Sequence, residues 1–448
     1  MNPIYFQDLR HAKRLRSILE IFSKCPTGSV PQACSDASQA QSIYRFWSNP
    51  KVSVSAILNS HIDGTVARAL SCQTVLSIQD TTDLDFTSHP GTEGLGFLNQ
   101  TKQQGIKVHN CFAVSGEGAP LGLLHQHCWV RDKPPVKKKD PKKVKNNQKP
   151  IEEKESYRWL TTLTASESKI SEQVQLVQVA DREADIFELF SQARQANSEL
   201  LIRAKTNRKV KHELGQLFAT LSQSPVLGEL SLELRRNPKR ASRSAQLQIR
   251  AMTVTLEVPQ HLPNKHQLKP IELNALLVEE IGSPADGGPP IRWRLLTSLP
   301  LDTFEQACQC VRWYSYRWLI ERFHFTLKSG CKLEDLQLQH RDRLLKALAT
   351  YNIVAWRLMS MTYQARLTPE VSCEVIVPPA EWKLLRRKFE PKSRSKKPPT
   401  LRQAIIWIAR LGGFLARKRD GEPGIKTLWR GYTKLHHLLE GAQLAAKQ

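Results

Sequence analysis

Three carboxylates in the sequence occupy positions from which they could hold a divalent metal ion. Asp80 ends the strand-like run TVLSIQD, Asp181 ends the run VQLVQVAD, and Glu321 lies in a helical stretch far downstream. Strand ends and helix faces hold side chains rigidly, and open α/β sheets form ligand crevices at the carboxyl ends of their strands. Three carboxylate ligands suit Mg²⁺ or Mn²⁺. The positions alone are a weak signal, because aspartate also ends strands as an ordinary turn residue.

A second pattern surrounds Glu321 and adds cationic groups. Tyr314, Arg317, Glu321 and Lys328 follow one another at intervals of three, four and seven residues. At about 100° per residue, this spacing places all four side chains within an arc of about 60° on one helix face. Such cations beside a glutamate suit a site that holds phosphate next to a metal, although a salt-bridged surface helix has the same spacing. His324, one turn beyond Glu321, is a candidate for holding a metal ligand in place.

The charge of the chain points to a polyanionic partner. The 448 residues include 66 Lys and Arg against 42 Asp and Glu, a formal net charge of +24. A disordered polycation is excluded, because 40% of the residues are hydrophobic and 10 are Trp. The N-terminus has no apolar signal-peptide region, and no run of about 18 apolar residues lacks a charge. We therefore expect a cytoplasmic protein associated with the nucleoid.

The elements that must position these residues change in type along the chain. Residues 1–70 have the apolar spacing of helices with basic residues between. Strand-like runs follow, and residues 152–205 then alternate helix, strand, helix and strand, which indicates a parallel α/β unit. Residues 206–290 predict a largely β insertion, and residues 292–299 predict a further strand.

The C-terminal third of the sequence is mostly helical in pattern. Residues 302–364 predict a long helical stretch that carries the Tyr314-to-Lys328 pattern. Two helical segments, 401–417 and 426–446, follow a basic hinge. Further upstream, the lysine-rich segment 133–149 predicts a solvated loop. Nine cysteines without a C-x-x-C pair argue against a zinc ribbon or a disulfide framework.

Three signature regions of the sequence resemble one known family. QDTTDL at 79–84, VADREADIFEL at 179–189 and the Tyr-Arg-Glu-Lys spacing resemble the IS-four family of DDE transposases, the Tn-five-like cut-and-paste enzymes. The resemblance implies an α/β fold with an RNase H-like catalytic core interrupted by a β-rich insertion. It implies a helical N-terminal DNA-binding domain at 1–70 and a catalytic domain at 71–375 that contains the insertion at 206–290. A helical C-terminal dimerisation domain would follow at 376–448.

The resemblance also implies an activity and roles for individual residues. Asp80, Asp181 and Glu321 would be the catalytic residues and would bind two Mg²⁺ or Mn²⁺ ions per active site. The substrate would be double-stranded DNA, with transposon ends cut through a hairpin and joined to target DNA by a homodimer in a synaptic complex. The implied DNA contacts are the phosphate-binding Tyr314, Arg317 and Lys328, the base-stacking Trp293, and Arg203, Lys205 and Arg208.

Two alternatives remain open at the level of sequence. A catalytically silent relative could bind DNA, dimerise and inhibit transposition, and the short stretch before Asp8 favours this alternative because members of the family begin further upstream. An RNase H-like nuclease acting on DNA structure is the other alternative, and it would not need a C-terminal dimerisation segment. The complete set of three carboxylates favours the active transposase.

Overall fold

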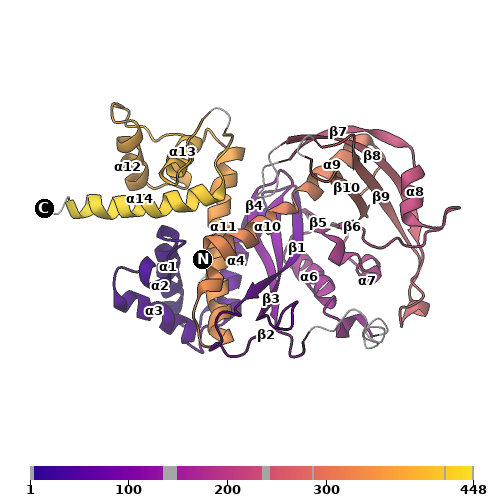
Figure 1. Ribbon diagram of the computed structural model, residues 1–448, viewed down its shortest axis with the longest axis horizontal. Helices are drawn as coiled ribbons and strands as arrows, with labels where there is room; N and C mark the ends of the chain where they lie inside the picture. Colours follow the sequence, from indigo (N-terminus) through magenta and orange to yellow (C-terminus); the bar gives the residue numbers. More distant parts are fainter. Residues whose placement is uncertain (1–4, 135–148, 235–242, 285–286, 418–419, 446–448) are drawn as a thin grey trace.

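The computed structural model describes residues 5–134, 149–234, 243–284, 287–417 and 420–445 (Figure 1). Most of the predicted lysine-rich loop, residues 135–148, lies outside the described residues. Within the described ranges, none of the helices combines the length and the apolar character needed to cross a membrane. All nine cysteines are free.

Four helices form the N-terminal part of the chain, as the apolar spacing predicts. In the first of them, Leu15, Ile18 and Phe22 form a fully buried stripe, and the Asp8 carboxylate accepts a hydrogen bond from the Arg10 backbone N–H at the helix start. The basic residues between the apolar ones are exposed to solvent. The four helices are α1 (Leu9–Lys24), α2 (Val30–Ala33), α3 (Ala37–Ser48) and α4 (Val54–Ala69).

The described strands form one ten-stranded mixed sheet. At its centre β1 pairs parallel with β5, and β5 pairs parallel with β6, while β3 pairs antiparallel with both β1 and β4. The resulting order, β4-β3-β1-β5-β6, is that of the RNase H-like core expected from the sequence. The core strands are β1 (Thr74–Asp85), β3 (Gln104–Ser115), β4 (Pro120–Trp129), β5 (Gln175–Ala180) and β6 (Ser198–Arg203), with the short β2 (Gly96–Phe97) at the edge beside β3.

The predicted β insertion continues this sheet. β10 pairs antiparallel with β6 on one side and with β9 on the other, and β8 and β7 extend the ladder outward. The insertion is therefore joined to the core through the pairing of Leu295–Thr297 of β10 with β6, and its strands extend the same sheet (Figure 1). Its elements are α8 (Leu217–Gln223), β7 (Val226–Leu234), β8 (Arg243–Leu256), β9 (Ile271–Glu280) and the returning β10 (Arg292–Thr297).

The helix expected after Asp181 is shorter than its sequence pattern predicts. Only a 3₁₀ turn, Arg182–Ala184, and the short α7 (Phe187–Ser191) form there. The Asp185 carboxylate accepts hydrogen bonds from the backbone N–H groups of Lys205 and Thr206. These bonds tie the segment to the loop after β6 and so interrupt a regular helix. The helix predicted before β5 forms as α6 (Tyr157–Glu167), within the predicted range, and packs against α7.

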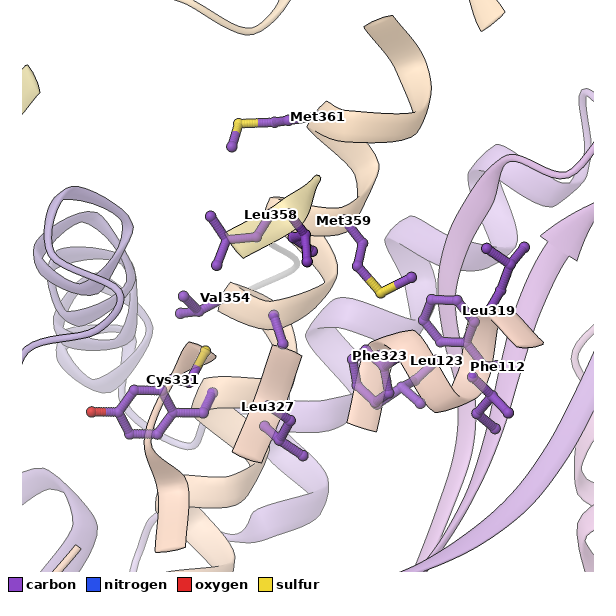
Figure 2. Packing of buried hydrophobic residues seen from close by; sticks show 14 of the residues in the cluster. Phe112, Leu123, Leu319, Phe323, Leu327, Cys331, Val354, Leu358, Met359 and Met361 are labelled. Carbon is purple, nitrogen blue, oxygen red and sulfur yellow. The ribbon is translucent and has the colours of Figure 1, made fainter. Parts of the chain in front are cut away.

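The long helix predicted over 302–364 is broken into pieces, so that prediction is wrong. α9 (Phe304–Ser315) ends in a turn whose backbone hydrogen bonds span three residues, from Tyr316 to Trp313 and from Arg317 to Tyr314. α10 (Trp318–Phe325) then continues into a π-helical turn, Thr326–Gly330. The break lets the apolar side of α10 turn onto the sheet, where the Phe323 ring stacks on Phe112 at a centroid distance of 4.9 Å (Figure 2).

α11 (Arg341–Leu367) is the central helix of the molecule and lies between the N-terminal helices and the sheet (Figure 1). It packs against α1, α3, α4 and β4, and the Trp47 indole N–H donates to Thr350 on it. Buried side chains of α11, among them Val354, Leu358 and Met359, fill the core shown in Figure 2.

Three more helices complete the C-terminal part: α12 (Pro379–Phe389), α13 (Leu401–Leu411) and α14 (Ile425–Ala445). α13 and α14 meet backbone to backbone, because a Cβ atom at Gly431 would lie 1.8 Å from the carbonyl oxygen of Ile408. A Cβ atom at Gly412 would be equally close to the Thr427 carbonyl oxygen. Only glycine permits this approach.

Candidate active site

Asp80 and Asp181 lie side by side at the point where two parallel strands separate. The pairing of β1 with β5 runs from Thr74 and Gln175 to Ile78 and Val179, and each aspartate is two residues further along its own strand. Asp181 directly follows β5, as predicted. Asp80 was expected to end its strand, but it does not, because β1 stays paired with β3 as far as Asp85. The two aspartates nevertheless occupy the same level of the sheet.

Glu321 approaches these aspartates from α10, which packs against β1. Burial, together with the carboxylates of Asp181 and Glu321, raises the pKa of Asp80 to about 7, although Arg317 opposes the shift. The guanidinium of Arg317 forms an ion pair with Glu321 one turn away. Burial acts against its charge, but Tyr314 and Glu321 raise the pKa of Arg317 above its usual value. Three segments far apart in the sequence thus bring three carboxylates and one arginine together.

The donor set of this site fits a hard divalent cation in type but does not enclose one as the side chains stand. Among the described residues, no group of three or more His, Cys, Asp or Glu side chains is gathered closely enough to hold a metal ion. Glu321 is turned to Arg317, and Asp181 accepts the backbone N–H of Glu183 at 2.8 Å. Carboxylates are the ligands that Mg²⁺ or Mn²⁺ prefers, and a cation among these three would relieve the repulsion that helps to raise the pKa of Asp80.

His324 lies beside Asp80 rather than supporting Glu321. Its Nδ1 is 3.7 Å from the Asp80 Oδ2, and its Nε2 is 3.0 Å from the side-chain nitrogen of Asn110. The Asn110 oxygen accepts a hydrogen bond from Gln126, so the Asn110 NH₂ group donates to the Nε2 of His324. The remaining ring hydrogen is therefore on Nδ1 and faces Asp80. Burial lowers the pKa of His324 to about 3, which keeps the ring neutral.

Four of the residues implied as DNA contacts gather beside the carboxylates. The Tyr314 ring meets the half-buried Trp293 edge to face, with centroids 5.0 Å apart. Arg203 lies next to Tyr314 and Arg317 and donates to the Arg292 carbonyl oxygen at 3.0 Å. Tyr314 itself is only 3% exposed, and burial raises the pKa of its hydroxyl. In this structure it therefore supports Trp293 and is not presented at the surface.

Lys328 does not share one regular helix with Tyr314, Arg317 and Glu321, which corrects the single stripe expected from the sequence. It lies in the π-helical turn, where its Nζ donates to the Asp83 carbonyl oxygen at 2.6 Å and pairs with Glu334 at 3.1 Å. The helix break before α10 and the wider π turn after it each change the rotation about the helix axis. The arc calculated for one regular helix consequently does not apply.

The loop after β6 holds two residues with different environments. Lys205 is exposed, whereas Arg208 is 8% exposed and forms an ion pair with Asp185 at 2.7 Å. Arg208 also donates to the Asp185 carbonyl oxygen. The structure thus makes Arg208 an internal anchor of the loop rather than a residue available to DNA.

Several arginines near the site were not singled out in the sequence. Burial and the neighbouring charges of Arg292, Arg182 and Arg203 lower the pKa of Arg294, whose guanidinium lies 4.1 Å above the Phe218 ring. Arg182 directly follows Asp181, and Arg292 and Arg294 flank Trp293. Their positions next to Asp181 and Trp293 in the sequence are the signal that could have found them. That signal becomes informative once β5, β6 and β10 are known to lie side by side.

Both ends of the chain match known domain families. Residues 1–52 match a family described as transposase DNA-binding, and residues 353–448 match one described as the transposase Tn5 dimerisation domain. The first match covers α1 to α3, and the second covers the later part of α11 together with α12 to α14. The sheet that carries Asp80 and Asp181 lies between them.

Proposed function

The chain belongs to the Tn5-like transposases of the IS-four family, and from this premise we propose that it cuts transposon ends and joins them to target DNA. Cleavage proceeds by divalent-metal-dependent phosphoryl transfer, by way of a hairpin at the end. Asp80, Asp181 and Glu321 are the proposed catalytic residues. The observation that carries the proposal is the convergence of these three side chains. The charges of Asp181 and Glu321 contribute, after burial, to the raised pKa of Asp80.

The proposed metal ligands are the same three carboxylates, with two Mg²⁺ or Mn²⁺ ions per site. When bound, the ions supply activation of the attacking water or 3′-hydroxyl and stabilisation of the leaving oxygen. His324 orients one of these ligands, since its Nδ1–H faces Asp80.

Arg317 exchanges partners in this proposal. In the structure it neutralises Glu321. A DNA phosphate offers the guanidinium a second anion with two acceptor oxygens, so arrival of the phosphate frees the Glu321 carboxylate to act as a ligand. Arg203 and the exposed Lys205 extend the phosphate contacts along the strand. Trp293, partly exposed above Tyr314, receives the base that is flipped out when the hairpin forms.

The partners follow from the matched domains. A transposase with a DNA-binding domain and a dimerisation domain binds DNA and pairs with a second copy. We place the synapsis of two transposon ends in such a homodimer, with the protein in the cytoplasm at the nucleoid.

The test uses a duplex oligonucleotide that carries the inverted repeat flanking the reading frame, with Mg²⁺. Asp80→Ala, Asp181→Ala and Glu321→Ala should each reduce cleavage to background, while binding in a gel-shift assay is retained. Asp302→Ala, at an exposed position between β10 and α9, is the matched control and should cleave like the wild type.

The alternatives have distinct outcomes in the same assay. Binding without any cleavage by the wild type would indicate the silent inhibitor. Cleavage of unrelated DNA without strand joining would indicate the nuclease. Retained cleavage in any one of the three alanine variants would contradict the assigned triad.

A further inference from the structure

The two catalytic aspartates stand where the backbone no longer sets the distance between their strands. The last residues paired between β1 and β5 are Ile78 and Val179. From there β1 continues with β3, while the chain after β5 turns into the Arg182–Ala184 turn. Asp80 and Asp181 need a relative position fixed within a fraction of an ångström if they are to share metal ions. Some other group must supply that constraint.

Arg158 on α6 spans this gap. Its Nε donates to the Thr81 hydroxyl at 3.1 Å, and its terminal nitrogen donates to the Glu183 carboxylate at 2.9 Å. Thr81 is the residue after Asp80, and the Glu183 backbone N–H donates to the Asp181 carboxylate. The third guanidinium nitrogen donates to the Glu155 carbonyl oxygen at 2.8 Å. One planar group therefore connects the neighbour of one catalytic aspartate with the neighbour of the other.

A buried hydrogen-bond chain fixes the Thr81 end of this connection. Gln79 donates to Gln178, so its amide oxygen accepts from the Nε2–H of His109. The Nδ1 of His109, 2.9 Å from the Thr81 hydroxyl, is then an acceptor, and Thr81 donates to it. Thr81 is left with a lone pair for Arg158. Burial keeps the pKa of His109 well below its usual value, so the ring stays neutral and the direction of the chain is set.

The Arg158 side chain is not available to DNA. It is 11% exposed, all three of its nitrogens are used, and its guanidinium lies 5.4 Å from the ring centres of both Trp129 and Trp159. A buried arginine whose contacts all lead to protein atoms is poorly placed to bind a phosphate. Its charge also lies near Asp181, where it offsets part of the repulsion between the carboxylates.

We propose that Arg158 is a positioning residue that sets the spacing of Asp80 and Asp181 through Thr81 and Glu183. The inference rests on the proposed function, because it gives the two aspartates the task of holding a divalent cation together. Removal of a group that orients metal ligands typically weakens metal binding by about 10- to 100-fold.

The experiment measures Mn²⁺ binding to the full-length chain by titration calorimetry, and folding by thermal denaturation. Arg158→Met, which keeps the length of the side chain, should raise the Mn²⁺ dissociation constant by about tenfold or more. Arg158→Lys should bind almost as weakly, because one ammonium cannot contact both partners. Thr81→Val and Glu183→Ala each remove one contact and should give smaller increases. They also keep the proposal testable if Arg158→Met does not fold.

Arg194→Met is the matched control. Arg194 is also a partly buried arginine, but within the described ranges its hydrogen bonds go to the carbonyl oxygens of Phe190, Gln192 and Ser198. It should lose thermal stability while its Mn²⁺ affinity stays at the wild-type value. A folded Arg158→Met or Arg158→Lys protein with wild-type Mn²⁺ affinity would overturn the positioning role alone. Mn²⁺ binding by the wild type that persists in Asp80→Ala would overturn the proposed metal site and this role with it.

Discussion

On the sheet side of the site, Asp80 and Asp181 stand on neighbouring parallel strands, whereas on the helix side Glu321 stands on an eight-residue helix between a break and a π-helical turn. On the sheet side the pairing of β1 with β5 ends two residues before each aspartate, and a buried hydrogen-bond chain from Thr81 to Gln178 and the contacts of Arg158 to Thr81 and Glu183 extend the constraint. The helix side is held by ion pairs of partly exposed side chains, Arg317 with Glu321 and Lys328 with Glu334. The sheet side is therefore the more rigid half, and the helix side is the half that can rearrange in the proposed binding of phosphate and metal.

The largest effect is expected at Arg317. Arg317→Ala removes the cation that faces both Glu321 and the proposed phosphate, so cleavage of the transposon end should fall by about 10²- to 10³-fold. The dependence of DNA binding on salt should also weaken by roughly one phosphate contact. Cleavage kinetics and gel shifts at several salt concentrations measure the two effects. Arg312→Ala, a change on α9, is the control, and equal losses in both variants would contradict a specific role of the helix side.

A second prediction concerns the protonation of the sheet side. In EDTA the unfolded chain releases the Asp80 proton near its ordinary pKa of about 4, whereas the folded protein retains it to about pH 7. Between these values the folded state binds more protons, so the free energy of unfolding falls as pH rises. Asp80→Asn removes this loss and should raise the free energy of unfolding at pH 8 by about 1–4 kcal/mol. Urea unfolding at pH 5 and pH 8 measures it.

Asp83→Asn is the control for that experiment on the same strand. Asp83 pairs with the buried ammonium of Lys107, and this variant should be less stable than the wild type because it leaves that charge without its counter-ion. Mg²⁺ should stabilise the wild type and should not stabilise Asp80→Asn to the same extent. If Asp80→Asn is destabilised in EDTA as well, Asp80 is not held under repulsion, and the comparison between the two sides loses its basis.

The smallest effect is expected at Lys328. Its hydrogen bond to the Asp83 carbonyl oxygen and its pairing with Glu334 are partly exposed. Lys328→Met should therefore lower the free energy of unfolding by only about 1 kcal/mol in urea. Its effect on cleavage of transposon ends should exceed its effect on stability if the lysine turns to DNA. A loss of stability as large as that of a buried ion pair would show that the helix side is as rigid as the sheet side.

The same contrast explains what could be predicted from the sequence. The apolar run VQLVQVAD placed Asp181 at the end of β5, and strand pairing brings Asp80 to the same level even though β1 runs five residues further. The helix-side pattern failed at Lys328, because a regular rotation was assumed through the break at Tyr316 and the π turn. Neither irregularity has a sequence signal as strong as a proline.

Arg158 could not be found from local sequence at all. It lies on a helix 77 residues from Thr81, and an arginine in such a helix usually points to solvent. Only the packing of α6 beside β1 reveals its two partners. Asp80, Asp181 and Glu321 could be predicted from the family resemblance. Arg158, which is proposed to set the spacing of the two aspartates, could be found only from three-dimensional contacts.

The continuity of the sheet has a mechanical consequence for Trp293. β10 pairs with β9 from Arg292 to Thr297, and this ladder sets Trp293 opposite Val278, whereas β6 pairs only with Leu295–Thr297. The ladder to β9 fixes the backbone of Trp293, and the edge-to-face contact with the buried Tyr314 supports its ring. The indole therefore acts as a fixed stop, and the bending needed to bring a base against it must occur in the DNA.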